Sequence, residues 1–205
     1  MDFEKVLRGR KSVRKFSSRE VSWKDLADVL EAGTLAPSSG NLQSWVFVVV
    51  RDAKNRAALV EALPREQSWA GKAPVLVVIC SDVERVRTMY GARGEALYAV
   101  QNCAAAAENM LLKAVDAGIG ACWIGYFDEK PIAKLLELDK DLRPQAVLAL
   151  GYGEPLEEKP REPLQSFVFF EKFGNRKRDV EVWPLAHAAG RVAEKVKHKL
   201  SGLKK

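Results

Sequence analysis

Residues 94–117 are the segment that most limits what this chain can fold into. The larger apolar residues recur at helical spacing along one face: Leu97, Val100, Ala104, Ala107, Leu111 and Val115. Small residues such as Ala99, Cys103 and Ala105 extend the apolar surface beyond one stripe. A helix that is apolar nearly all round is buried, and small side chains allow another helix to approach closely. We therefore expect either a helix at a dimer interface or a helix buried in the core of one subunit.

Helical and strand patterns alternate along the rest of the chain. Residues Ser22–Asp25 form a capping box, and an apolar stripe runs from Leu26 to Gly33. The runs 45–50 and 74–80 are short and β-branched, which is typical of strands covered on both faces. Further helices are predicted at 2–8, 53–63, 128–138 and 186–200, and further strands at 121–124 and 145–151. Strands separated by helices predict an α/β or α+β domain.

The composition fits a soluble chain with one packed domain. Of 205 residues, 47% are hydrophobic, which is enough for a sizeable core. The longest apolar run, residues 45–50, is far shorter than the ~20 residues that span a bilayer. The N-terminus lacks the basic and apolar segments of a secretory signal. We therefore expect a cytoplasmic protein that does not contact a membrane.

The net charge of +6 does not by itself indicate a nucleic-acid surface. Residues 191–205 hold six basic residues and one acid, so this tail carries +5 and the rest of the chain about +1. A short basic helix without a recognition motif is usually a solvated face. We expect no nucleic-acid partner, and a basic binding module that uses this tail is the alternative.

The cysteines and histidines do not form a metal site or a hydrolytic triad. Cys80, Cys103 and Cys122 are widely spaced in apolar stretches, which predicts buried, reduced thiols. Both histidines, His187 and His198, lie near the C-terminus. No metal ligand set is predicted.

A basic segment follows the first predicted helix. Arg10, Ser12 and Arg14 would point to the same side if this segment is extended. Two guanidinium groups and a hydroxyl suit a phosphate, because the planar fork of arginine binds oxyanions through two hydrogen bonds. Taken alone, the segment equally fits a solvated basic stretch.

Two further segments could contact a flat heterocyclic ligand. Residues Ala36–Trp45 are rich in hydroxyl and amide side chains and lead directly into a strand, although they also read as an ordinary helix-to-strand loop. Residues Gly118–Asp128 contain glycines that would permit close approach of the backbone to a ligand. The alternative for them is a helix cap followed by a buried strand.

The fourth segment runs from Gly151 to Arg161 and adds two cations, Lys159 and Arg161, that could complete a phosphate site. Its Gly-Tyr-Gly sequence runs into Pro155 and lacks a third glycine, so it is not a dinucleotide fingerprint. Any nicotinamide donor must therefore bind without a Rossmann domain.

In this order and at these spacings, the four segments resemble the flavin-dependent nitroreductase family. Arg10–Phe16 matches the family's Arg-Arg-Ser-x-Arg-x-Phe. Ala36–Trp45 matches its Ala-Pro-Ser-x-x-Asn-x-Gln-Pro-Trp, with Ser44 in place of the proline. Gly118–Gly125 matches its Gly-x-Gly-x-x-x-Ile-Gly, and Gly151–Arg161 its Gly-Tyr-x-x-x-Pro with downstream cations.

The resemblance covers about residues 3–170 and implies an α+β, nitroreductase-like fold with a mostly antiparallel sheet flanked by helices. It implies an FMN-binding domain at 1–171 and a C-terminal extension with a basic helix at 172–205. By resemblance, the long central helix at 94–117 joins a homodimer, and Phe167–Phe170 form a strand that crosses to the partner's sheet. FMN would lie at the dimer interface.

The resemblance also implies the residues that bind the cofactor. The full set is Arg10, Lys11, Ser12, Arg14, Pro37, Ser38, Ser39, Asn41, Gln67, Ile124, Gly125, Lys159 and Arg161. The phosphate and ribityl end would be held by Arg10, Ser12, Lys159 and Arg161. The residues from Pro37 to Asn41 would come from the other subunit. The backbone at Ile124 and Gly125 would meet the isoalloxazine, and Gln67 is included because the family often has a polar side chain there.

The implied activity is hydride transfer from NADH or NADPH to flavin N5, followed by electron transfer to a small-molecule acceptor in a ping-pong reaction. The acceptor would be a nitroaromatic, a quinone or a flavin. Arg14 is the predicted catalytic residue, because its charge near the flavin pyrimidine would stabilise the reduced ring. The alternatives are specialised flavin chemistry (flavin fragmentation, reductive dehalogenation or peptide dehydrogenation) and a non-enzymatic flavin-binding protein.

Overall fold

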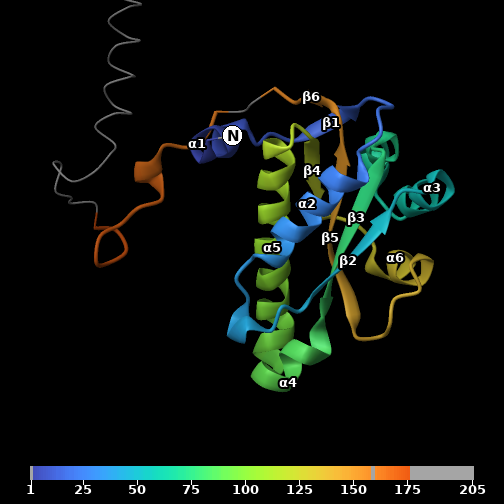
Figure 1. The fold of residues 1–205 in the computed structure, drawn as a ribbon. Helices are drawn as coiled ribbons and strands as arrows, with labels where there is room; N and C mark the ends of the chain where they lie inside the picture. Colours follow the sequence, from blue (N-terminus) through green and yellow to red (C-terminus); the bar gives the residue numbers. More distant parts are fainter. Residues whose placement is uncertain (1, 158–159, 176–205) are drawn as a thin grey trace, which may run out of the picture. The chain divides into compact units, whose positions relative to one another are not determined.

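The computed structural model describes residues 2–157 and 160–175 (Figure 1). The chain divides into two compact units, Met1–Glu157 and Glu158–Lys205. The helix predicted at 186–200 and both histidines lie outside the described residues. The predicted end of the FMN-binding domain at residue 171 stays a prediction.

The first unit is built on a four-stranded sheet in which every neighbouring pair is antiparallel. The strand order is β2 (Trp45–Val50), β3 (Val75–Asp82), β5 (Leu142–Gly151) and β4 (Gly120–Ile124). From Val75 to Ser81 every residue of β3 is buried, as expected for a central strand covered on both faces. This arrangement confirms the predicted α+β class with an antiparallel sheet.

Helices cover both faces of the sheet (Figure 1). On one face α2 (Trp23–Thr34) and α5 (Ala99–Asp116) pack against alternate residues of β3 and β5. On the other face lie α3 (Ala53–Glu61), the 3₁₀ segment η2 (Arg65–Lys72) and α6 (Glu129–Leu135). Because side chains alternate along a strand, each face of the sheet has its own apolar core.

A second, two-stranded sheet lies beside the first. It pairs β1 (Val13–Phe16), which follows α1 (Phe3–Gly9), with β6 (Gly153–Pro155). A parallel bridge between Ser12 and Ala121 joins β1 to the main sheet. The approach is close: a Cβ on Gly120 would lie 2.7 Å from the side chain of Val13. Gly120 therefore allows two strands to pack closely. This agrees with the alternative prediction for Gly118–Asp128, a helix cap followed by a buried strand.

The long helix differs from its prediction at its start. It was expected to begin at residue 94, but α5 begins at Ala99 after a π-helical segment at Gly94–Tyr98. A separate helix, α4 (Val83–Arg93), precedes it and was not predicted. Only Val83 and Val86 of α4 are buried, which leaves little apolar periodicity to detect. Its start is marked by Asp82, whose side chain accepts from the amide of Arg85 at 2.9 Å.

The structure is compatible with both predictions for α5, a helix in the core of one subunit and a helix at a dimer interface. One face is buried in the subunit core through Cys103, Ala107 and Met110. The opposite face carries Ala105 and Leu112, which stay half-buried in the single chain. Exposed Gln101 and Glu108 lie on the same face, so its uncovered apolar surface is limited to such residues as Ala105 and Leu112, and the dimer contact stays a prediction.

Residues 160–175 of the second unit include the 3₁₀ turn η4 (Leu164–Ser166). The predicted crossing segment Phe167–Phe170 is not assigned to a strand in the described chain. The Phe170 amide donates to the carbonyl of Asn175 at 2.8 Å, and the rings of Phe169 and Phe173 lie 4.6 Å apart. A strand that forms only against a second subunit stays a prediction.

Candidate functional site

Arg14 lies at a bulge in β1. Val13 pairs with Pro155 and Lys15 with Glu154, so Arg14 is the extra residue on its strand. A bulge bends the strand and redirects a side chain, and such bulges often lie beside active sites. The exposed Arg14 side chain places its guanidinium 5.4 Å from the ring centroid of Trp69, within the range of a cation–π contact. The fold thus holds a fixed, solvent-facing cation on an aromatic ring.

The segment η2 brings a second predicted residue to this place. Gln67 donates from Nε2 to the backbone carbonyl of Tyr126 at 2.8 Å. This bond joins η2 to the end of β4, where Ile124 is buried and Gly125 is exposed. The structure therefore groups Arg14, Gln67 and Gly125 around β1, η2 and β4.

The basic segment before β1 lies along β4. Arg10 ends α1, and its backbone N–H donates to the carbonyl of Val6 at 3.0 Å. Arg10, Lys11 and Ser12 are all half-buried, and Ser12 bridges to Ala121. The segment is extended, as the phosphate-site interpretation required, and it is not a freely solvated stretch.

The loop with the other predicted residues is held by α5. Asn102, only 3% exposed, accepts from the Ser39 amide at 2.9 Å and donates from Nδ2 to the hydroxyls of Ser39 and Ser44 at 3.1 Å each. The Ser38 hydroxyl accepts from the amide of Gln43 at 2.9 Å. These bonds order the loop in the single chain.

Asn102 was missed in the sequence because it lies within the apolar helix pattern. An amide inside an otherwise apolar stretch was the available signal, since buried polar groups need partners. The Ser44 that replaces the family's proline is one of those partners. Pro37 and Asn41 are exposed on this loop, and Asn41 has a positive φ of 56°.

The two groups of predicted residues lie toward opposite ends of α5. The loop is bonded to Asn102 near the start of the helix, whereas Gly9, just before Arg10, packs near Val115 close to its end. Val115 follows Asn102 by thirteen positions of α-helix, which is ~20 Å along the axis. One subunit therefore does not gather Pro37, Ser38, Ser39 and Asn41 around Arg14.

The last two predicted residues are not tested by this geometry. Lys159 lies outside the described residues, and Arg161 belongs to the second unit.

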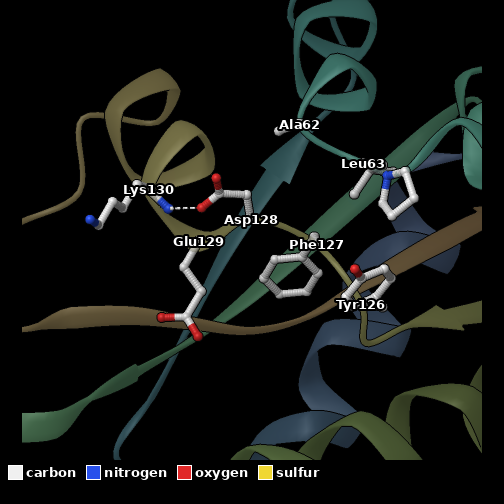
Figure 2. Close-up of a pocket in the computed structure, with 8 residues that line it drawn as sticks. Ala62, Leu63, Tyr126, Phe127, Asp128, Glu129 and Lys130 are labelled. Carbon is white, nitrogen blue, oxygen red and sulfur yellow. Dashed lines mark hydrogen bonds between the residues drawn. The ribbon is translucent and has the colours of Figure 1, made fainter.

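A cleft of about 610 Å³ lies next to the end of β4 (Figure 2). It is lined by Ala62, Leu63 and Pro64 after α3 and by Tyr126, Phe127, Asp128, Glu129 and Lys130 at the start of α6. Asp128 accepts from the backbone N–H of Lys130 at 3.1 Å and so caps α6. Tyr126 is 76% exposed and immediately follows Gly125. Sequence reasoning missed Tyr126 as a lining residue, although its place in the Gly-rich segment was visible.

The cysteines do not take part in this site. All three are free and buried, as predicted. Burial raises the pKa of the thiols of Cys80 and Cys103 to about 12, so neither forms a thiolate near neutral pH. The described residues contain no group of three or more His, Cys, Asp or Glu side chains that could hold a metal ion.

Comparisons with known proteins agree with the observed fold and identify the family. The nitroreductase family model matches residues 7–66 and 61–152, which include β1, η2 and β4. The chain belongs to the nitroreductase family. Across the described residues, no helix is both long and apolar enough to cross a membrane.

Individual relatives are similar over most of their length. A relative from Archaeoglobus fulgidus, whose name pairs NADH dehydrogenase with NAD(P)H nitroreductase, is 35% identical over 159 residues, covering 76% of this chain and 86% of the relative. An FMN reductase [NAD(P)H] from Bacillus subtilis is 29% identical, covering 84% of this chain and 74% of the relative. The solved structure of a nitroreductase family protein from Streptococcus pneumoniae matches with a TM-score of 0.73 at 26% identity, covering 82% and 98% of the two chains.

Proposed function

We propose that this chain, an FMN-dependent NAD(P)H oxidoreductase of the nitroreductase family, reduces a nitroaromatic, quinone or flavin acceptor in a ping-pong reaction. Bound FMN would supply the redox chemistry, accepting hydride from the nicotinamide and returning electrons to the acceptor. The relatives named for NAD(P)H nitroreductase and FMN reductase support this activity. The observation that carries the proposal is the grouping of Arg14, Gln67 and Gly125.

The described residues fit a flavin. An exposed glycine at Gly125 leaves its backbone open to a flat ring, and Gln67 stabilises the adjoining turn through Tyr126. Arg14 would bind the pyrimidine edge of the isoalloxazine and stabilise negative charge there. Its contact with Trp69 restricts the guanidinium, so less side-chain entropy is lost when the ligand binds.

Arg10, Lys11 and Ser12 would bind the phosphate and ribityl end of the cofactor. Arg10 and Ser12 lie on an extended, half-buried segment beside β4, so their polar groups start partly desolvated and positioned. Charge-assisted hydrogen bonds to phosphate are about twice as strong as neutral ones. Lys159 and Arg161 would add cations to the same end.

The cofactor site would be completed by a second copy of the chain. The loop with Pro37, Ser38, Ser39 and Asn41 is bonded to α5 ~20 Å from the end of this helix, where Gly9 of α1 packs near Val115. Two α5 helices packed antiparallel would bring this loop of one subunit toward Arg14 of the other. The half-buried Ala105 and Leu112 on the outer face of α5 support such a contact.

The test is the visible spectrum of the purified protein during anaerobic titration. We expect an oxidised-flavin spectrum that bleaches on addition of NADH or NADPH and returns when a quinone or nitroaromatic is added. Parallel initial-rate lines in a two-substrate experiment would support ping-pong order. A flavin that neither nucleotide bleaches would contradict the proposal and favour specialised flavin chemistry or a flavin carrier.

A further inference from the structure

A second, cationic pocket lies at the end of the sheet near β1. It has a volume of about 280 Å³ and lies between the exit of β1, the end of β2 and the end of η2. We call it the cationic pocket; its polar lining consists of Ser17, Ser18, Glu20, Arg51, Arg56 and Lys72. Its size is near the lower limit of about 300 Å³ for small-molecule pockets, which suits one terminal group of a ligand.

Arg51 is fixed in this pocket with part of its guanidinium unused. Nη2 donates to the carbonyl of Val21 at 2.9 Å, and the guanidinium lies 4.3 Å from the ring centroid of Trp23. Nη1 is buried and has no hydrogen-bond partner among the described residues. A buried donor without a partner is costly, so a ligand that turns the guanidinium toward itself and accepts from this nitrogen would relieve the cost.

The second guanidinium is held on the same wall. Arg56 donates from Nε to the carbonyl of Arg51 at 3.1 Å and from Nη1 to the carbonyl of Ala73. Backbone carbonyls orient both arginines, so neither bond neutralises their charge. Lys72 adds a third, exposed cation at the rim.

The negative charge that the pocket lining offers is small by comparison. Glu20 Oε2 lies 3.7 Å from Arg51 Nη2, and the Glu20 side chain is 86% exposed. Exposed ion pairs of this length contribute little, because solvent screens them. Three cations against one solvated acid leave an excess of positive charge in a concave site.

We propose that the cationic pocket binds a phosphate group of an organic ligand: the 2′-phosphate of NADPH or the phosphate of a separate nucleotide. Arginine pairs bind phosphate through two parallel hydrogen bonds, and the hydroxyls of Ser17 and Ser18 supply neutral donors beside them. NADPH differs from NADH only by the 2′-phosphate, so a fixed arginine is the usual means of telling them apart.

The position of the cationic pocket suits a donor that reaches the proposed flavin site. Ser17 comes three residues after Arg14 on the same extended segment, which is roughly 10 Å. Lys72 likewise follows Trp69 by three residues along η2. The NADPH form of this inference rests on the proposed function, whereas phosphate binding itself does not.

The experiment compares Lys72→Gln with Lys54→Gln, which removes the same charge from an exposed position on α3 outside the pocket lining. We expect Lys72→Gln to raise the ratio of KM for NADPH to KM for NADH ~10-fold, as for loss of one charge-assisted bond. Lys54→Gln should leave this ratio within about twofold of the wild type. Arg51→Lys, which keeps the charge but loses the fork, should raise the ratio as well.

A second experiment identifies which molecule supplies the bound phosphate. Calorimetry measures the binding of 2′,5′-ADP, 5′-ADP and orthophosphate to the flavin-loaded protein. Competition of 2′,5′-ADP with NADPH, weakened by Lys72→Gln, supports the 2′-phosphate. Lys72-dependent binding of 5′-ADP or orthophosphate without competition supports a separate nucleotide. Binding and KM ratios that are equal in wild type, Lys72→Gln and Arg51→Lys overturn the proposal. Failure of the proposed function would instead appear as a flavin that neither nucleotide bleaches.

Discussion

The region around β1 and the loop before β2 contribute to the proposed flavin site in opposite ways. Around β1, Arg14 is exposed, bulged out of its strand and in contact with Trp69. In the loop, the hydroxyls of Ser39 and Ser44 are already bonded to Asn102, and Ser44 is 1% exposed. The first region offers side-chain groups to a ligand, whereas much of the second region's bonding capacity is used to set its own shape.

This difference is the reason for our proposal that the site needs two copies of the chain. A loop that is rigid before binding loses little entropy when it contacts a ligand, provided that the ligand reaches it. In one subunit the loop lies toward the wrong end of α5. A partner subunit would bring the pre-ordered loop and the exposed arginine together.

The largest expected effect comes from a charge on the outer face of α5. Ala105→Glu would bury an unpaired carboxylate in the proposed helix contact, which costs several kcal/mol, so we expect ~100-fold or greater weakening of the dimer. Mass by light scattering and co-purified FMN by absorbance should fall together. If the dimer dissociates but FMN is retained at full affinity, the two-subunit site is wrong.

The matched control is Ala57→Glu. Ala57 is an exposed alanine on α3, on the opposite face of the sheet from α5. The same substitution there should change neither the mass nor the FMN content, because the new carboxylate stays in water.

The next effect concerns the β1 region. Arg10→Ala should weaken FMN binding ~10-fold or more, because a charge-assisted phosphate bond contributes about 1.5–3 kcal/mol. Arg8→Ala is the control, since Arg8 is exposed and bonded to Glu4 one turn before it on α1. Dissociation constants from flavin fluorescence quenching measure both. Equal affinity for Arg10→Ala and Arg8→Ala would remove Arg10 from the site.

The sequence predicted most residues of these two regions as motifs, but it did not predict how the regions are placed in the fold. The spacing of Arg10, Ser12 and Arg14 predicted an extended basic segment, because alternation along a strand is a local property. The bulge at Arg14 and the contact with Trp69 depend on how β6 and η2 pack against β1, which no local pattern records. The order of motifs identified the family, while their placement at opposite ends of α5 required the fold.

The missed elements have the same cause. Helix α4 has few buried residues, and its place is fixed by the cap at Asp82 and by packing against the start of α5. The cationic pocket combines residues from the exit of β1, the start of α3 and the end of η2, three segments that are spread over residues 17–74 of the sequence. Such sets of residues become visible only through tertiary contacts.

A smaller effect should follow when the loop loses its anchor. Asn102→Ala removes the buried amide that bonds to Ser39 and Ser44, which leaves the Ser39 backbone N–H without its acceptor and the Ser44 hydroxyl without its donor. We expect the free energy of unfolding to fall by about 1–3 kcal/mol, as measured by urea denaturation. Asn55→Ala, at an exposed position on α3, is the control and should change stability by less than about 0.5 kcal/mol. Faster amide exchange confined to residues 38–44 in Asn102→Ala would show that the loop has loosened.

The smallest effect tests whether Ser44 acts through Asn102 alone. Ser44→Ala removes one acceptor of the Asn102 amide, so we expect a loss of about 1 kcal/mol. The double variant with Asn102→Ala should be destabilised by less than the sum of the single effects, because both substitutions break the same bond. Full additivity would mean that Ser44 contributes through other contacts, and that the serine found where the family has proline is not part of the anchor. Less-than-additive loss would mean that Ser44 and Asn102 stabilise the loop through the one hydrogen bond that they share.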